Sequence, residues 1–251
     1  MSECFLHGFG RCRGKITGEH YISKAVLEAL GNDGCVEIGG LPWLPRQTMK
    51  KIGIGRLVSN MLCEEHNSGL SCLDSEAGKL FRALDAADKQ PAILPPVTDV
   101  TGKLIERWFI KVLCGLVVAA GFNNGTIPAE WKRLLVGGSW PAKWGLYIPY
   151  PPGVSVLARE FYLETLVNLG TKEVKAAKFR VAGVHLTVVL GQPDDPLAWG
   201  KYRPRGLIFD YPDKSEKRVE LKWPTKTDEA IIYTKVGAGC SEAPQWEGWR
   251  K

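Results

Sequence analysis

The sequence predicts an α+β fold, in which a small metal-stabilised unit precedes a region with a mostly antiparallel sheet. Three of the four histidines lie in the first third of the chain, together with several cysteines. Apolar residues recur at helical spacing in two segments, 75–87 and 103–122. The last third instead has short β-branched runs between turn residues, such as 178–191, which predict strands and hairpins.

Length and composition exclude several classes of protein. A chain of 251 residues can bury roughly 70% of its unfolded surface, so its fold needs no disulfides. The longest apolar run, 112–122, is shorter than the ~20 residues of a membrane helix, and the N-terminus lacks the order of a signal peptide. With seven cysteines and no such signal, we expect a cytoplasmic protein with free or metal-bound thiols. The net charge of +6 allows a nucleic-acid partner without requiring one.

A proline-rich segment suggests a division of the chain. Prolines at 91, 95 and 96 prevent a helix from continuing there. We therefore predict a zinc-knuckle unit in residues 1–90 and an α+β domain in 91–251 that recognises a target or a protein partner. Within the first unit, Ser23 and Gly31 are expected to bound a short helix. The segment that follows, 31–55, is rich in glycine and proline and predicts an ordered excursion over the surface.

Two Cys-x-x-His pairs predict a metal site. A glycine follows the first pair, as a tight knuckle requires, and the second pair is expected where a strand passes into a helix. Two thiolates and two imidazoles suit zinc. The predicted ligands are Cys4, His7, Cys63 and His66. Cys12 in the same first loop is an alternative to His7. The simpler reading is that Cys4 and His7 are a loose terminal pair, that Cys12 is a solvent-facing loop cysteine, and that Cys63 and Cys72 are small buried residues.

The order of motifs around these pairs resembles that of the HNH endonucleases, whose ββα-metal active site is built around a treble-clef zinc knuckle. The resemblance covers about residues 1–90. Its elements are Cys4-x-x-His7-Gly8, then Glu19-His20-Tyr21-Ile22-Ser23, then Leu62-Cys63-x-x-His66-Asn67. One branch of the family also has Asn-x-x-Leu followed by an aspartate, which Asn67, Leu70 and Asp74 match.

The resemblance implies a metal-dependent endonuclease that hydrolyses phosphodiester bonds in nucleic acid, with DNA favoured over RNA. It implies His20 as the general base, Glu19 and Asn67 as ligands of a catalytic Mg²⁺ or Mn²⁺, and a structural role for the zinc. Enzymes of this kind occur in restriction, phage defence and mobile elements. The sequence departs from the family pattern in three places: histidines replace the second cysteine of both pairs, Ser23 replaces a proline, and the middle asparagine has Asn60 as its nearest candidate.

Two other functions remain open. The chain could be a non-catalytic zinc module that binds nucleic acid or protein, or a partner-binding protein that acts through its C-terminal sheet. Basic residues could contact phosphates in the first reading, at Arg11, Arg13, Lys15, Arg46, Lys50, Lys51 and Arg56. Within the crowded stretch 63–74 we expect Glu64 and Glu65 to face solvent and Cys72 to be buried, and we expect Asp74 to cap a helix or to support the site.

Overall fold

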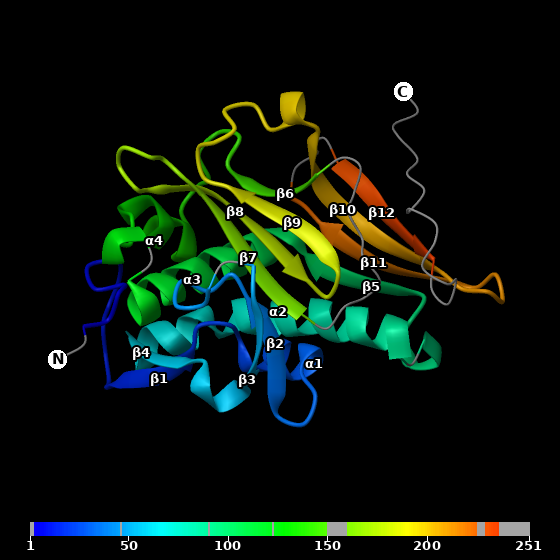
Figure 1. The fold of residues 1–251 in the computed structure, drawn as a ribbon, viewed down its shortest axis with the longest axis horizontal. Coiled ribbons are helices and arrows are strands. Elements are labelled where there is room, and N and C mark those ends of the chain that lie inside the picture. The colour runs from blue at the N-terminus through cyan, green and yellow to red at the C-terminus, as the bar shows by residue number, and fades with distance from the viewer. Residues whose placement is uncertain are drawn as a thin grey trace.

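A long buried helix lies at the centre of the fold, between a second helix and a curved sheet. The computed structural model describes residues 3–45, 47–89, 91–121, 123–149, 160–224 and 229–235. In it, helix α3 (Gly102–Ala120) runs beside α2 (Glu64–Lys89), and the large sheet covers both (Figure 1). This mixed architecture with its mostly antiparallel sheet confirms the predicted α+β class.

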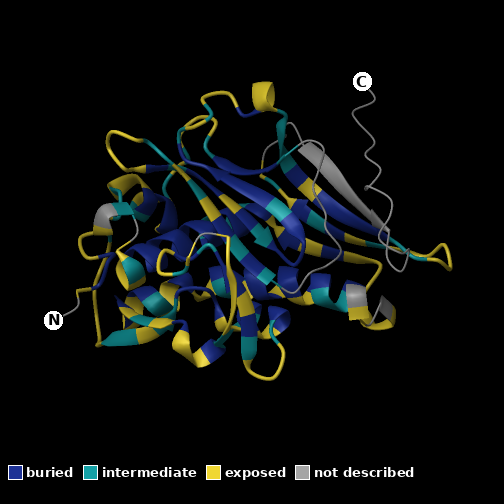
Figure 2. Ribbon diagram, in the orientation of Figure 1, coloured by how far each residue is buried: buried dark blue, intermediate teal, exposed yellow. Residues whose placement is uncertain are grey.

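Helix α3 forms because its apolar residues surround nearly its whole circumference. Its side chains are almost all buried from Ile105 to Val117, and Figure 2 shows the helix as the most continuously buried element. Trp108 contacts Phe81 of α2 with ring centroids 5.6 Å apart, while Phe109 contacts Phe179 of the sheet at 4.5 Å. The helix therefore has partners on both sides, as a helix with a broad apolar surface requires. The predicted core helix is confirmed.

The large sheet has the order β3-β2-β7-β8-β9-β6-β10-β11-β5, and β12 pairs with β10 beside β6. Three of its pairings are parallel, namely β2 with β7, β5 with β11 and β10 with β12. Its strands are β2 (Cys35–Gly39), β3 (Met49–Gly53), β5 (Val97–Thr101), β6 (Gly145–Pro149), β7 (Glu160–Val167), β8 (Val174–Val181), β9 (Val184–Val189), β10 (Lys201–Asp210), β11 (Glu216–Lys222) and β12 (Glu229–Lys235). The predicted hairpin β10–β11 is present, and the segment 178–191, predicted as strand, contributes to the antiparallel pair β8–β9.

A separate two-stranded sheet leads into α2. Strand β1 (Ile16–His20) pairs antiparallel with β4 (Val58–Cys63), and α2 begins at the next residue after β4. A bulge in the pairing lies between Thr17 and Gly18. Helix α1 (Lys24–Leu30) follows β1 and packs on α2, with Ser23 and Gly31 at its ends as predicted. An antiparallel strand pair thus leads directly into a long helix.

The segment predicted as an ordered surface excursion contains two strands that were not predicted. In β2, Val36 and Ile38 are buried while Glu37 is exposed, which is a short alternation hidden among glycines. Strand β2 pairs with β3 and also with β7, so this segment becomes one end of the large sheet. A partner more than 100 residues away stabilises these strands, and local sequence carries no sign of such a partner.

The core is continuous across the predicted boundary at residue 90. The boundary falls between the end of α2 and the short helix η2 (Pro91–Ile93). Buried residues on both sides, such as Met61 and Phe109, belong to one hydrophobic cluster, and the large sheet takes strands from both sides.

The remaining helices are short: η1 (Ile54–Arg56), η3 (Asn123–Gly125), α4 (Ala129–Leu135) and η4 (Leu197–Trp199). Of the helices in the described parts of the chain, none has the length and apolar character needed to cross a bilayer.

Candidate metal centre and the β1–β4–α2 site

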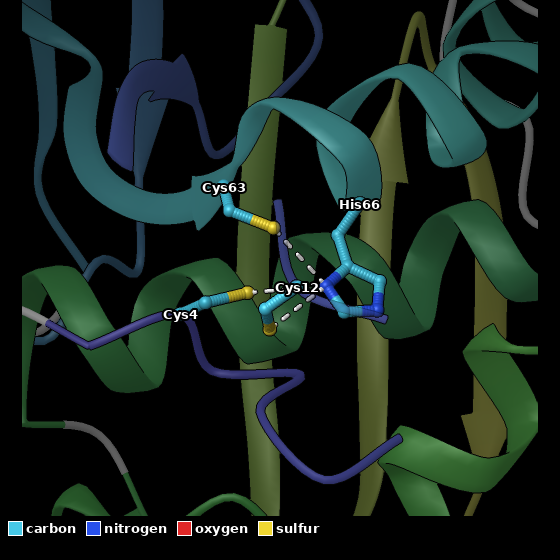
Figure 3. A group of neighbouring side chains, drawn as sticks. All are labelled: Cys4, Cys12, Cys63 and His66. Atoms are coloured by element: carbon cyan, nitrogen blue, oxygen red, sulfur yellow. Dashed lines mark hydrogen bonds between the residues drawn. The ribbon is translucent and has the colours of Figure 1, made fainter. Parts of the chain in front are cut away.

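Three cysteines and one histidine converge where the N-terminal loop meets the start of α2 (Figure 3). Cys4 and Cys12 come from the loop, Cys63 ends β4, and His66 lies in the first turn of α2. Their ligand atoms all lie within 4.8 Å of one another. Cys4, Cys63 and His66 are buried, and Cys12 lies on the more exposed side of the group.

The distances fit a tetrahedral metal ion. His66 Nδ1 lies 3.4 Å from Cys4 Sγ, 3.5 Å from Cys12 Sγ and 3.3 Å from Cys63 Sγ. Zinc bonds of about 2.3 Å to sulfur and about 2.0 Å to nitrogen place those atoms about 3.6 Å apart in a tetrahedron. Four protein ligands also leave no open position for substrate. The cluster can therefore bind a structural metal such as zinc, which confirms that part of the prediction.

The ionisation of the cysteine thiols favours a bound cation. Burial favours the neutral form of Cys63, but hydrogen bonds from the backbone N–H groups of His66 and Arg13 outweigh burial and lower the pKa of Cys63 to about 6. Partial burial and the neighbouring thiols of Cys4 and Cys63 raise the pKa of Cys12 to about 11. One thiolate thus forms readily and opposes the ionisation of the next, and a bound divalent ion offsets that repulsion.

The loop between the two halves of the cluster has a conformation that fits the start of α2. The carbonyls of Lys15 and Arg13 accept the N–H groups of Glu64 and Glu65, which have no partner inside the helix. Gly14 adopts a φ of +75°, and a Cβ there would lie 2.2 Å from the Glu64 carboxylate. The loop therefore holds Cys12 beside the helix through backbone contacts, and it requires glycine at position 14.

The structure places Cys12 in the fourth position and His7 outside the cluster. The His7 side chain is 66% exposed, and its Nδ1 lies 3.5 Å from Glu3 Oε1. The Cys4–His7 turn itself forms as expected, because the His7 N–H donates to the Cys4 carbonyl at 2.8 Å. That turn directs Cys4 inward and His7 outward, which corrects the predicted ligand set in favour of the alternative, Cys12.

Glu19 pairs with a buried lysine from the second region of the chain. Lys111 of α3 is 1% exposed, and its Nζ lies 3.1 Å from Glu19 Oε1 and 2.5 Å from Asp74 Oδ2. Ser23 donates a hydrogen bond to the other oxygen of Asp74, and Trp108 Nε1 donates to Ser23 Oγ at 2.6 Å. Asp74 thus lies within α2 and supports a polar network rather than capping a helix.

Asn67 is attached to β1 through Thr17. The Thr17 hydroxyl donates to the Leu62 carbonyl at 3.1 Å, so its lone pairs are left to accept the Asn67 Nδ2–H at 3.3 Å. Among the described residues this is the one hydrogen bond of the Asn67 side chain, so its Oδ1 is not engaged there. Glu19 lies two residues further along β1, beyond the bulge between Thr17 and Gly18.

His20 lies at the end of β1, beside an open groove of about 610 Å³. Lys24 and Glu28 of α1 line this groove with His20 and pair with each other at 3.5 Å. His20 Nε2 is buried and has no hydrogen-bond partner within the described residues. Asn60, the nearest candidate for the middle asparagine of the HNH motif, pairs with Gly18 in the β1–β4 sheet and is exposed.

The three predicted catalytic residues therefore occupy one short region, but no hydrogen bond or ion pair between described atoms joins them directly. Glu19 accepts a hydrogen bond from Lys111, and Asn67 donates one to Thr17. His20 Nε2 has no hydrogen-bond partner among the described residues. Lys111 was not among the predicted site residues. A lysine within an apolar helix could have identified it, because lysine is almost never fully buried unless it is paired.

Other predicted residues lie mostly as expected. Glu64 and Glu65 are exposed, whereas Cys72 is exposed rather than buried, so that prediction was wrong. The basic residues predicted to contact phosphates are exposed where the structure describes them: Arg11, Arg13, Lys15, Lys50, Lys51 and Arg56. Arg46 lies outside the described residues.

No protein family, curated protein or solved structure matches the chain. The function is therefore inferred from the chemistry of this site.

Proposed function

We propose that the protein is a metal-dependent nuclease of the HNH type, which hydrolyses phosphodiester bonds in nucleic acid, with DNA as the favoured substrate. The observation that carries the proposal is that β1 holds both oxygen donors, Glu19 as one of its own residues and Asn67 through its hydrogen bond to Thr17. Within the described residues, Lys111 engages Oε1 of Glu19 and Thr17 accepts the amide N–H of Asn67, so the second oxygen of Glu19 and the Oδ1 of Asn67 are available to a cation. Carboxylate and amide oxygens suit Mg²⁺ or Mn²⁺.

In this proposal Glu19 and Asn67 hold the catalytic ion, which would stabilise the charge that develops on the phosphate and the departing oxygen. His20 is assigned as the base that accepts the proton of the attacking water, and its buried Nε2 has no hydrogen-bond partner among the described residues. The Cys₃His cluster fixes the start of α2, and thereby the position of Asn67 one residue after His66. Exposed Arg13 and Lys15, in the loop that contacts α2, are available to bind phosphates.

The test compares wild-type protein with His20→Ala on plasmid and on single-stranded DNA and RNA, in Mg²⁺ and in Mn²⁺. A general base contributes about 10²–10⁴-fold, so cutting should fall by at least about 100-fold while zinc content stays unchanged. His7→Ala is the matched control, because His7 is an exposed histidine near the same unit. Equal cutting by wild type and His20→Ala would remove the role assigned to His20.

A second candidate function is a non-catalytic zinc module that binds nucleic acid or a protein partner. The ion pair of Glu19 with Lys111 favours it, since a carboxylate that already holds a cation is a weaker ligand for another. Wild-type protein that retains zinc and binds nucleic acid, but cuts none of the substrates above in either metal, would support this candidate over the nuclease.

A further inference from the structure

Lys111 occupies a position that resembles a metal site. Its ammonium lies between carboxylate oxygens from two different elements, Glu19 Oε1 of β1 and Asp74 Oδ2 of α2. Two carboxylates directed at one point are a usual arrangement for a divalent cation. Here α3 supplies the positive charge instead, and the lysine is fully buried in doing so.

The surroundings fix this ammonium in place. Both oxygens of Asp74 are occupied, one by Lys111 and one by the Ser23 hydroxyl, and Trp108 of the same helix α3 holds Ser23 in turn. Glu19 is less constrained, because the described contacts engage one of its oxygens. Asp74 therefore anchors the lysine, and the lysine orients Glu19.

We infer that Lys111 is a tethered cation, which fills the position between Glu19 and Asp74 that a divalent ion would otherwise take and leaves an added ion the free oxygens of Glu19 and Asn67. Lys111 is thus a positioning residue. The part that concerns Asn67 rests on the proposed nuclease function, whereas the occupation of the carboxylate pair does not.

The charges give the expected consequence. Glu19, Asp74 and Lys111 together carry a net charge of −1, and replacing the lysine by a neutral residue leaves −2 in the same half-buried place. Two adjacent carboxylates without a counter-charge attract a divalent ion. A Lys111→Met variant should therefore bind Mn²⁺ between these two carboxylates, at the position that the ammonium of Lys111 occupies in the wild type.

The experiment counts Mn²⁺ ions bound to zinc-loaded protein, by electron paramagnetic resonance and calorimetric titration. We expect Lys111→Met to bind one more Mn²⁺ than wild type, or to bind Mn²⁺ at least about tenfold more tightly, and the double variant Lys111→Met/Asp74→Asn to lose this gain. Lys24→Met is the matched control, since it removes one positive charge from an exposed lysine that also pairs with a carboxylate. Lys111→Arg, which keeps the cation, should behave as wild type.

A folded Lys111→Met protein with normal zinc content and wild-type Mn²⁺ binding would overturn the inference. If Lys111→Met is unfolded without Mn²⁺ but folds with it, the inference is supported. If it stays unfolded, Lys111→Gln replaces it, because its amide still donates to one carboxylate, and wild-type Mn²⁺ binding by that variant would also overturn the inference. Cutting by wild type decides the nuclease proposal separately. Where wild type cuts, Lys111→Met should bind Mn²⁺ better and cut less, whereas a purely structural lysine would lower both.

Discussion

Replacing Cys12 and His7 separately tests the ligand set of the metal centre. Cys12 Sγ lies 3.5 Å from His66 Nδ1, close to the roughly 3.6 Å of a tetrahedral zinc site, whereas the His7 ring is 66% exposed and contacts Glu3. Loss of a hydrogen-bonding partner outside a metal's ligands costs about 10–100-fold in affinity, so loss of a ligand should cost at least about 100-fold. At saturating zinc, a hundredfold weaker site lowers the free energy of unfolding by about 2.7 kcal/mol.

We therefore expect Cys12→Ser to lower zinc affinity at least about 100-fold and to lower the unfolding free energy by about 2.7 kcal/mol, with His7→Ala within about 0.5 kcal/mol of wild type. Zinc is measured by metal analysis after dialysis against a chelator of known affinity, and stability by urea unfolding with and without EDTA. If His7→Ala loses zinc and Cys12→Ser keeps it, the geometric assignment is refuted and the original pair of Cys-x-x-His motifs holds the metal.

Three further outcomes are expected. Zinc affinity should rise at least about tenfold per pH unit from roughly pH 7 to 9 in competition titrations, because the Cys12 thiol, with its pKa raised to about 11, releases a proton on binding, and any other thiol ligand that is still protonated adds to the slope. The Cys63 thiol, with its pKa lowered to about 6, should contribute mainly below that pH, and a flat profile would contradict the assignment. Glu106→Ala should cost about 3–5 kcal/mol in urea unfolding, because it leaves the buried guanidinium of Arg203 without its carboxylate partner. Gly40→Ala should lower the thermal midpoint far more than Gly8→Ala: both have positive φ, but a Cβ at Gly40 would lie 1.7 Å from the Leu163 carbonyl oxygen, whereas the space around Gly8 is open.

The elements that were predictable are those whose cause is local. Helix α3 follows from apolar residues on most of its circumference, and the β10–β11 hairpin from a turn sequence between two apolar runs. Three of the four residues in the metal cluster were predicted for the same reason, since each lies in a recognisable turn or strand end. Local spacing could not decide between His7 and Cys12, because the choice depends on how the 8–15 loop folds back onto α2.

What the sequence did not predict depends on contacts between distant segments. Strands β2 and β3 become regular because β7 lies beside them, and the exposure of Cys72 depends on which side of α2 faces the core. Lys111 is the clearest case. In the sequence it interrupts an apolar helix, and its role becomes visible when Glu19 and Asp74, 92 and 37 residues away, are seen to share its ammonium.

Helix α3 links the fold to the proposed chemistry. It packs so closely against the residue after β1 that a Cβ on Gly115 would lie 2.4 Å from Tyr21. One helical turn earlier, the ammonium of Lys111 contacts Glu19 of β1. Without α3, the apolar side chain of Met61 would be exposed to solvent. The carboxylates of Glu19 and Asp74 would also repel each other, because the ammonium of Lys111 would be missing. The β1–β4–α2 unit therefore depends on residues 91–251 both for its core and for the charge balance of its site. That region does more than add a recognition surface, because it completes the site in which the reaction is proposed to occur.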